Sequence, residues 1–336
     1  MRRLRLTAAA LVATSLVLAG CGGGDEEPAD EKPEAQEIAG GSEFASTWPL
    51  TGLPVEGEDT SVRTHPVLVT KIDNTGSSAP QVGLGSADLV VEELVEGGMT
   101  RLAVFHYSEL PEKIGPVRSM RATDIGIVSP VDASVVTSGA AAQTIARVKS
   151  AGIRIIQEGA KGIYRESSRS APYNVFANLP DIAESIEGEE DRPDDYLQWG
   201  EAGDLPKGQN ARTVAASFSG GHTTSWSYDK DGYRNVDGYA AEGDEFVADT
   251  VLVLRVQVGD AGYRDPAGNP VPETKLEGKG QAMLFHDGRL VRGTWTKDGL
   301  DAPLELSTKA GRLTVPAGHT WIELVPANGG NVTFGK

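Results

Sequence analysis

The chain has 336 residues, and its 31 Lys and Arg against 48 Asp and Glu give a formal charge of −17. Binding to the phosphates of DNA or RNA needs a basic surface, so this charge excludes nucleic acid as a general partner. The single cysteine excludes an internal disulfide, and no apolar run beyond the N-terminus approaches the roughly 20 residues of a membrane-spanning helix.

Residues 1–21 have the three parts of an export signal. A start rich in arginine is followed by an apolar stretch at 6–18 and by two small residues. The next residue is Cys21, and the sequence LAGC matches the bacterial lipobox, in which the cysteine thiol receives a diacylglyceryl group and the peptide is cut before it. We therefore expect a mature protein that begins at Cys21, is anchored to the cell membrane by lipid and lies on its extracytoplasmic face.

Residues 22–47 hold eight acidic side chains, one lysine and few large apolar residues. Such a segment buries too little apolar surface to offset the entropy of ordering, so we expect a disordered tether. A random coil of this length spans roughly 25–30 Å, which suits a protein that works at or in the cell wall.

Residues 48–187 mix strand patterns with helical patterns, which predicts an α/β or α+β domain. Period-two apolar runs predict strands at 67–72, 88–95, 100–107 and 134–138. Patterns with helical spacing predict helices at 119–127, 140–149 and 180–186.

Residues 188–210 interrupt this pattern with seven acidic residues and two prolines, which predicts an exposed linker or a long excursion from the domain. Residues 211–336 then predict a mostly-β domain, with strands at 246–258, 281–285, 290–295 and 320–324. Asp-Gly pairs at 231–232, 237–238, 287–288 and 298–299 indicate hairpin turns. The tryptophans of this domain, which belong either to its core or to a sugar-stacking surface, are Trp226, Trp295 and Trp321.

Several kinds of chemistry lack their sequence motif. The five histidines have no metal-ligand spacing, so we expect no metal centre. The glycines at 83 and 85 precede a strand instead of following one, which predicts a turn and not a dinucleotide site, and we expect no cofactor. A Ser-x-x-Lys match at 227–230 runs into a turn, which disfavours a serine nucleophile.

Gly97 and Gly98 separate two alternating runs, which predicts a hairpin with a two-residue turn. Counting back from that turn places Glu92, Glu96 and Arg101 on one face, with Arg101 diagonal to both glutamates. Two interpretations stay open. The cluster is either a surface ion-pair network or the floor of a pocket whose carboxylates act as acid and base.

Ser119 is a favourable N-cap, so we expect a helix that begins with Arg118 and Arg121 at its positive end. Cations are unfavourable there unless an anion meets them, either an internal one from Glu92 or Glu96 or a ligand's carboxylate or phosphate. The turn-rich segment 164–174 adds further polar groups, unless it is only a solvated loop. The candidate binding residues are thus Arg101, Arg118, Arg121, Arg169 and Asn174, and the candidate catalytic carboxylates are Glu92, Glu96 and Asp73.

Several short motifs in order resemble the YerB-like bacterial lipoproteins, a family without an assigned function. In the first domain they are PLTGLP (49–54), IDN (72–74), AD (87–88), EGGMTR (96–101), GPVRS (115–119) and RSAP (169–172). In the second they are GQAMLFHDG (280–288), GTW (293–295) and TW (320–321). The resemblance implies a lipid-anchored, two-domain envelope protein. Tyr173 stands where many members have histidine, which weakens any mechanism that needs an imidazole there.

Two functional hypotheses follow. The first is a binding module of the cell envelope that holds a wall polymer or an envelope protein through its arginines. The second is a hydrolase or lyase of wall glycan in which Glu92 or Glu96 is the general acid, one of them neutralised by Arg101 and the other raised in pKa by burial.

Overall fold

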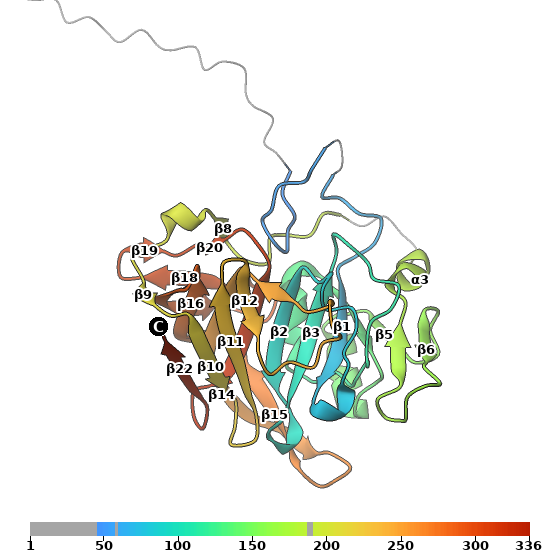
Figure 1. The fold of residues 1–336 in the computed structure, drawn as a ribbon. Helices are drawn as coiled ribbons and strands as arrows, with labels where there is room; N and C mark the ends of the chain where they lie inside the picture. The colour runs from blue at the N-terminus through green and yellow to red at the C-terminus, as the bar shows by residue number, and fades with distance from the viewer. Residues whose placement is uncertain (1–45, 58–59, 187–190) are drawn as a thin grey trace, which may run out of the picture. The chain divides into compact units, whose positions relative to one another are not determined.

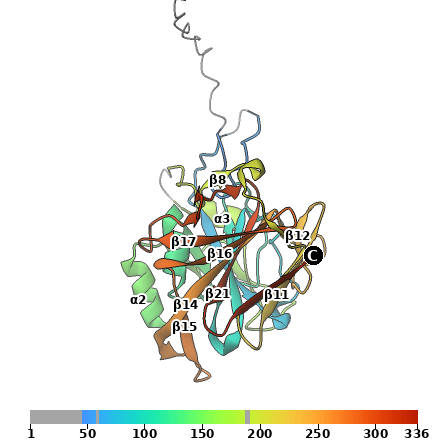
Figure 2. The ribbon, with the colours of Figure 1, turned by 90° about the vertical axis from the view of Figure 1, so that its left-hand side faces the viewer.

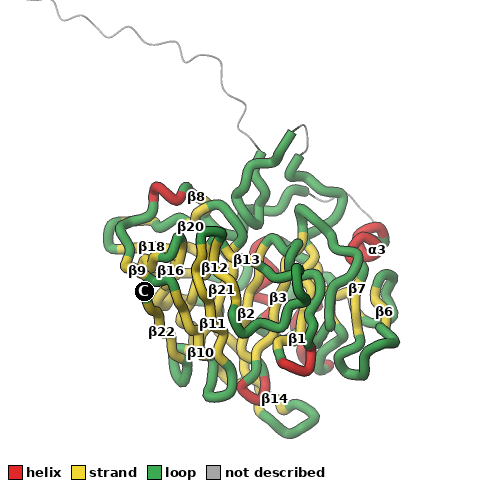
Figure 3. The backbone as a smooth tube through the Cα atoms, viewed as in Figure 1, coloured by secondary structure: helices red, strands yellow, loops and turns green. Residues whose placement is uncertain are grey.

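The structure is a computed structural model that describes residues 46–57, 60–186 and 191–336 (Figure 1). The expected signal peptide, Cys21 and nearly all of the expected tether lie outside the described residues. Strands dominate the described chain and helices are few (Figure 3). No helix in these ranges is both long and apolar enough to cross a membrane.

Residues 45–336 form one compact unit built on a mixed sheet of 13 strands, as far as the chain is described. From one edge to the other the sheet consists of β19 (Gly311–Arg312), β18 (Glu305–Thr308), β17 (Arg289–Lys297), β16 (Gly278–His286), β14 (Thr250–Arg264), β21 (Thr320–Pro326), β2 (Leu89–Leu94), β3 (Thr100–His106), β1 (Leu68–Asn74), β4 (Ser134–Thr137) and β5 (Ile155–Gln157). Two more strands pair off this path, with β15 (Pro270–Lys275) on β14 and β9 (Gln209–Asn210) on β17.

The centre of this sheet joins the strands expected for the first domain to those expected for the second. Strand β21 comes from near the C-terminus, yet it lies between β14 and β2 and runs parallel to both. The strands expected for the first domain and those expected for the second therefore share one continuous sheet. The expected linker is also partly internal, because Tyr196 and Leu197 are buried in the core.

Smaller sheets and helices complete the unit. A five-stranded sheet orders β13 (Val247–Ala248), β12 (Gly232–Asn235), β11 (Thr223–Asp229), β10 (Thr213–Ser217) and β22 (Asn331–Gly335). Two-stranded sheets pair β20 (Val315–Pro316) with β8 (Trp199–Gly200) and β6 (Ile163–Arg165) with β7 (Val175–Ala177). The α-helices are α1 (Asp124–Val128), α2 (Ala142–Ser150) and α3 (Leu179–Glu184), and the 3₁₀ turns are η1 (Gly76–Ser78), η2 (Glu96–Gly98), η3 (Ser129–Val131) and η4 (Ala202–Asp204).

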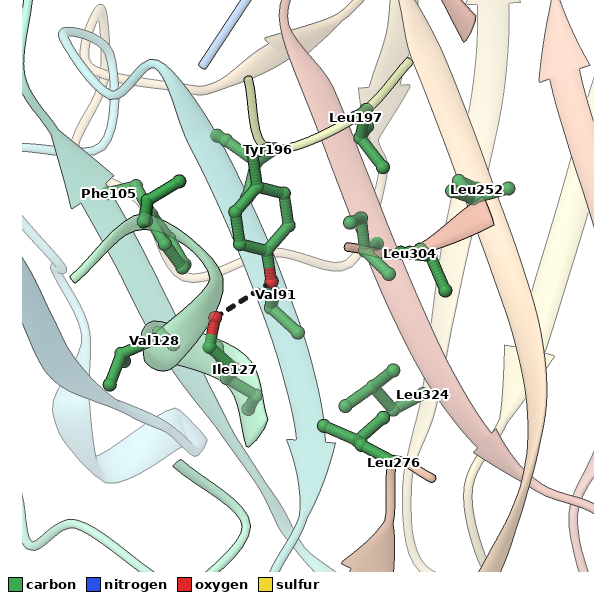
Figure 4. Packing of buried hydrophobic residues seen from close by; sticks show 14 of the residues in the cluster. Val91, Phe105, Ile127, Val128, Tyr196, Leu197, Leu252, Leu276, Leu304 and Leu324 are labelled. Atoms are coloured by element: carbon green, nitrogen blue, oxygen red, sulfur yellow. Dashed lines mark hydrogen bonds between the residues drawn. The ribbon is translucent and has the colours of Figure 1, made fainter. Parts of the chain in front are cut away.

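The middle of the main sheet is buried on both faces. On β3, Ala103 and Phe105 belong to one hydrophobic cluster, while Leu102 and Val104 belong to the other, as the period of two in a strand requires. The first cluster packs under the segment that carries Tyr196, whose hydroxyl donates to the carbonyl oxygen of Ile127 at 3.0 Å (Figure 4). The second cluster packs against the five-stranded sheet. Each apolar Å² removed from water contributes about 25 cal/mol, so these two layers stabilise the unit.

One edge of the main sheet has α/β character. Strands β1, β4 and β5 are mutually parallel, and α2 connects β4 to β5. The carboxyl ends of β1 and β4 therefore lie at the same edge, which is where ligands bind in open parallel sheets. Asp73 lies near the end of β1, and the loop 138–141 follows β4.

Most predicted strands are present, with ends that differ by a few residues. The Asp-Gly pair at 287–288 turns the β16–β17 hairpin, as expected, whereas the β11–β12 turn consists of residues 230–231 and Gly232 begins β12. The predicted helix at 119–127 is wrong in its first half, because α1 begins only at Asp124. Ser119 is therefore no N-cap, and residues 118–121 form a loop.

Candidate functional site

Three arginines from two segments come together at the edge where β1 and β4 end. Arg101 lies on β3, and Arg118 and Arg121 lie on the loop that leads to α1. Backbone hydrogen bonds fix this loop across the strand ends: the Arg118 N–H donates to the Lys71 carbonyl at 2.8 Å, and the Ser138 N–H donates to the Arg118 carbonyl at 3.2 Å.

Two of these arginines are paired with carboxylates. Arg118 donates from Nε to Oδ2 of Asp73 at 2.9 Å, and Arg121 binds Glu96 with two donors, one of them Nε to Oε2 at 2.9 Å. Burial alone would raise the pKa of Glu96, but the hydrogen bonds and charge of Arg121 outweigh it and hold that pKa below its usual value. Glu96 is therefore ionised at neutral pH, and both of its carboxylate oxygens accept hydrogen bonds from Arg121.

Arg101 differs from both because no carboxylate lies within ion-pair distance of it in the described part of the chain. Its side chain is almost wholly buried, with 8% of the residue exposed, and it makes one hydrogen bond, from Nη1 to the Ser119 carbonyl at 2.8 Å. Burial, helped by the charge of Arg121, lowers the pKa of Arg101 to about 10. The three arginines form ion pairs with two carboxylates, Asp73 and Glu96, whose charges also act on Arg101.

The structure places Arg169 and Asn174 differently from this cluster. Arg169 donates to the carbonyls of Ser78, Ala79 and Pro80, so its donors hold a neighbouring loop. Asn174 accepts from Arg165, an exposed side chain.

Tyr173 does reach the cluster, because the Arg118 guanidinium lies 5.3 Å from the centre of its ring. A cation over an aromatic face is attracted by the ring's quadrupole. Tyr173 thus links the 169–174 segment to the arginines. The sequence did not predict this contact.

The β2–β3 hairpin corrects the predicted register. Glu93 pairs with Arg101 and Glu92 with Leu102, because Gly97 lies inside the 3₁₀ turn η2 and the connection is longer than two residues. A slip of one residue turns every side chain to the opposite face. Glu92 therefore lies on the opposite face from Arg101, and the expected diagonal contact between them is wrong.

Glu92 instead belongs to a buried cluster that the sequence did not predict. Its Oε1 lies 2.9 Å from Nε2 of His222 and accepts from Thr224 at 2.9 Å, while Asn74 donates to it at 3.0 Å. On the neighbouring strand Glu323 is paired with it in register. His222 and Glu323 are 130 and 231 residues from Glu92, so no local pattern could have joined them.

The two carboxyl groups of this cluster titrate in opposite directions. Burial would raise the pKa of Glu92, but the hydrogen bond and charge of His222 lower it below the usual value. Burial and the nearby charge of Glu92 raise the pKa of Glu323 well above its usual value. The two carboxyl groups thus differ in how readily they ionise, and neither residue has any exposed surface.

A second buried cluster joins Lys71 to Glu93 at 2.8 Å and to Asp124 at 2.7 Å. All three side chains have no exposed surface, and the charges of the two carboxylates outweigh burial in raising the pKa of Lys71. This triad lies under the arginine loop and holds α1 to β1 and β2. It has no access to a ligand.

An open pocket of about 580 Å³ adjoins the arginine cluster. Glu96, Ser119 and Arg121 line one side, and the tip of the β14–β15 hairpin lines the other. No group of three or more His, Cys, Asp or Glu in the described ranges could hold a metal ion. The three tryptophans considered for sugar stacking, Trp226, Trp295 and Trp321, are core residues with at most 3% exposure.

Two family models match the chain: the N-terminal domain of "Protein of unknown function (DUF3048)" at residues 50–192 and the C-terminal domain of the same family at 213–322. The chain belongs to the DUF3048 family. It is 26% identical over 293 residues to "Putative lipoprotein YerB" of Bacillus subtilis (strain 168), which covers 83% of this chain and 86% of that relative. The crystal structure of the YerB protein from Bacillus subtilis has the same fold, with a TM-score of 0.71 and 21% identity over 85% of this chain and 99% of that one.

The DUF3048 match confirms the family resemblance drawn from the short motifs. Its two domains share the main sheet in this chain, because β21 of the C-terminal match lies against β2 of the N-terminal match. The arginine cluster lies within the N-terminal domain, whereas the hairpin across the pocket belongs to the C-terminal domain.

Proposed function

We propose that this DUF3048 protein is a lipid-anchored protein of the extracytoplasmic face that binds an anionic group of a cell-wall polymer or envelope partner through its arginine cluster. The observation that carries the proposal is Arg101. Arg101 is buried, makes one hydrogen bond and forms no ion pair within the described residues, while the nearby carboxylates of Asp73 and Glu96 are paired with Arg118 and Arg121. A bound anion would supply a counter-charge to Arg101.

Two facts support the membrane anchor. The sequence LAGC ends at Cys21, after a stretch typical of an export signal, and the curated relative carries the word lipoprotein in its name. The body itself carries excess negative charge, so an anionic membrane surface would repel it and the lipid would provide the attachment.

The glycan hydrolase alternative needs a protonated carboxyl group that a substrate can reach. Glu96 and Asp73 are held by Arg121 and Arg118, while Glu92 and its neighbour Glu323, whose pKa is raised, are sealed from solvent. The geometry therefore favours binding over acid catalysis.

The test compares Arg101→Met with the wild type in full-length, lipidated protein. Methionine keeps much of the buried aliphatic volume and removes the charge, and Glu96 keeps its partner Arg121. We expect a melting temperature equal to or above that of the wild type, together with lost binding to purified cell walls of the host bacterium. Arg234→Met, which removes an exposed arginine on β12, is the matched control and should bind normally. Normal wall and envelope-protein binding by Arg101→Met would refute the proposal.

A further inference from the structure

A second pocket lies between the chain that follows β1 and the segment 235–246, which leads from β12 to β13. This β12–β13 pocket has a volume of about 170 Å³, and Gln81, Trp321 and several residues of 235–246 line it. In Figure 2, β12 and α2 lie on opposite sides of the main-sheet strands β14 and β21. The pocket beside the arginines shares no lining residue with this one, so the two are separate sites.

The segment 235–246 is held against the chain after β1, so the β12–β13 pocket is formed before a ligand enters. The Gln81 N–H donates to the Tyr239 carbonyl at 2.7 Å. Further along the segment, the Asp244 carboxylate accepts from the Gly83 N–H at 2.5 Å. A preformed site loses less conformational entropy on binding than a flexible one.

Gln81 contributes a hydrogen-bond acceptor that the protein leaves without a donor. The residue is only 1% exposed, and its Nε2 donates to the Asp73 carbonyl at 2.7 Å and to Oδ1 of Asn74 at 3.2 Å. Its Oε1 accepts no hydrogen bond from any residue in the described ranges. Buried polar atoms are rarely left unpaired, so a ligand in this pocket is expected to donate a hydrogen bond there.

Glu245 gives the β12–β13 pocket its charge. It is the one charged side chain among the described residues that line the pocket. Its Oε2 accepts from the Gly243 N–H at 3.0 Å, and neither oxygen forms an ion pair with a described residue. One net negative charge in a pocket that no cationic side chain of the described chain lines disfavours an anionic ligand and favours a cation.

The other walls are largely apolar, with Leu84, Phe246 and Trp321 among them. The rings of Phe246 and Trp321 pack edge to face with their centroids 5.7 Å apart, which fixes both. Methylene groups pack against such walls, and the faces of aromatic rings attract cations. A cavity of about 150 Å³ admits benzene, so this pocket holds a group of about six non-hydrogen atoms and not a whole polymer unit.

We propose that the β12–β13 pocket binds a primary ammonium group on a short aliphatic stem. An ammonium group has three donors and no acceptor, which matches the free oxygens of Gln81 and Glu245. Its methylene stem matches the apolar walls. Two envelope molecules carry this chemistry, namely a wall peptide with a diamino-acid side chain and a lipid with an ethanolamine headgroup. The site does not depend on the arginine cluster.

The decisive variant is Glu245→Gln. Glutamine removes the charge, keeps the shape and keeps an oxygen for the Gly243 N–H. The side chain is exposed and forms no ion pair within the described residues, so we expect an unchanged melting temperature. Glu242→Gln is the matched control, because it makes the same charge change at an exposed residue of the same segment that does not line the pocket.

Calorimetric titration of the full-length protein in detergent micelles compares two probes. They are Nα-acetyl-lysine methylamide and its Nε-acetylated form, which keeps the stem and loses the charge. We expect the wild type and Glu242→Gln to bind the first probe at least about tenfold more tightly than the second, and Glu245→Gln to lose that difference. Equal affinity of the wild type for the two probes would overturn the proposal, as would full retention of the preference by Glu245→Gln.

Two further comparisons identify the source of the ammonium group. Binding to host peptidoglycan that falls when acetic anhydride acetylates its amines, in the wild type but not in Glu245→Gln, would support a wall peptide. Tighter binding of glycerophosphoethanolamine than of glycerophosphocholine, abolished in Glu245→Gln, would support a lipid headgroup. Arg101→Met should keep the preference for the charged lysine probe, and its loss in that variant would overturn the independence of the two sites.

Discussion

Glu92 on β2 and Glu323 on β21 are paired in register at the centre of the main sheet, and neither carboxyl group has exposed surface. His222 and Thr224 bond Glu92, while the Trp226 indole N–H donates to Oε1 of Glu323 at 2.8 Å. Burial, together with the repulsion between two neighbouring carboxylates when both are ionised, raises the pKa of Glu323, whereas His222 lowers the pKa of Glu92.

This pair predicts a pH-dependent effect of Glu323→Gln. Glutamine cannot ionise and keeps an oxygen for the Trp226 indole. Because the folded-state pKa of Glu323 is raised, its contribution to stability is present below its unfolded value near 4.5 and is lost as pH rises through the folded pKa. The melting temperature of Glu323→Gln relative to wild type should therefore rise between pH 5 and pH 9.

Glu92→Gln is the matched opposite. Its folded-state pKa is lowered, so its ionised form stabilises the fold above the unfolded value near 4.5, and the variant should melt below wild type at pH 7. Thermal melts of both variants across the same pH series check the pair. A constant offset in melting temperature for both variants would contradict the opposite pKa shifts of the two carboxyl groups.

Lys71→Met should destabilise the fold strongly. The change leaves Glu93 and Asp124 buried without their cation, and breaking a buried ion pair costs about 3–5 kcal/mol. Lys161→Met is the control, because its pair with Glu184 is exposed and its loss should leave the free energy of unfolding nearly unchanged. Urea denaturation measures both, and similar midpoints for the two variants would be inconsistent with the triad.

Arg118→Ala should have an intermediate cost. Its ion-pair partner is Asp73. Without Arg118 the buried Asp73 carboxylate would still accept hydrogen bonds from the N–H and the hydroxyl of Thr75. We expect a loss of about 1–3 kcal/mol in urea denaturation, together with weaker wall binding. If neither the free energy of unfolding nor wall binding changed, Arg118 would contribute neither to stability nor to the binding site.

Cys21→Ala should release the protein from membranes or block its processing, because the thiol that carries the diacylglyceryl group is gone. Cell fractionation with immunodetection measures this. Membrane retention equal to that of the wild type would rule out the lipid anchor.

The sequence predicted the strands well because each carries its own period-two pattern, and it identified the arginines that come together. The predicted pairing of β2 with β3 was wrong by one residue, because a 3₁₀ turn at Gly97 replaces the expected two-residue turn. The sequence also failed to predict partners that are distant along the chain. His222, Glu323 and Arg264 have no local feature that distinguishes them from other polar residues. The pairing of β21 with β2 brings Glu323 to Glu92, the start of β11 brings His222 there, and the β14–β15 hairpin brings Arg264 to the pocket that Arg121 lines.

The position of β21 has a consequence for how the chain reaches its native state. The strand that completes the sheet between β2 and β14 ends ten residues before the C-terminus, at Pro326 of 336 residues. The pairing of β21 with β2 joins segments more than 200 residues apart in sequence, and contacts of such long range form slowly because the intervening chain must first be ordered. Removal of residues 317–336 would leave β2 and β14 without the strand that joins them.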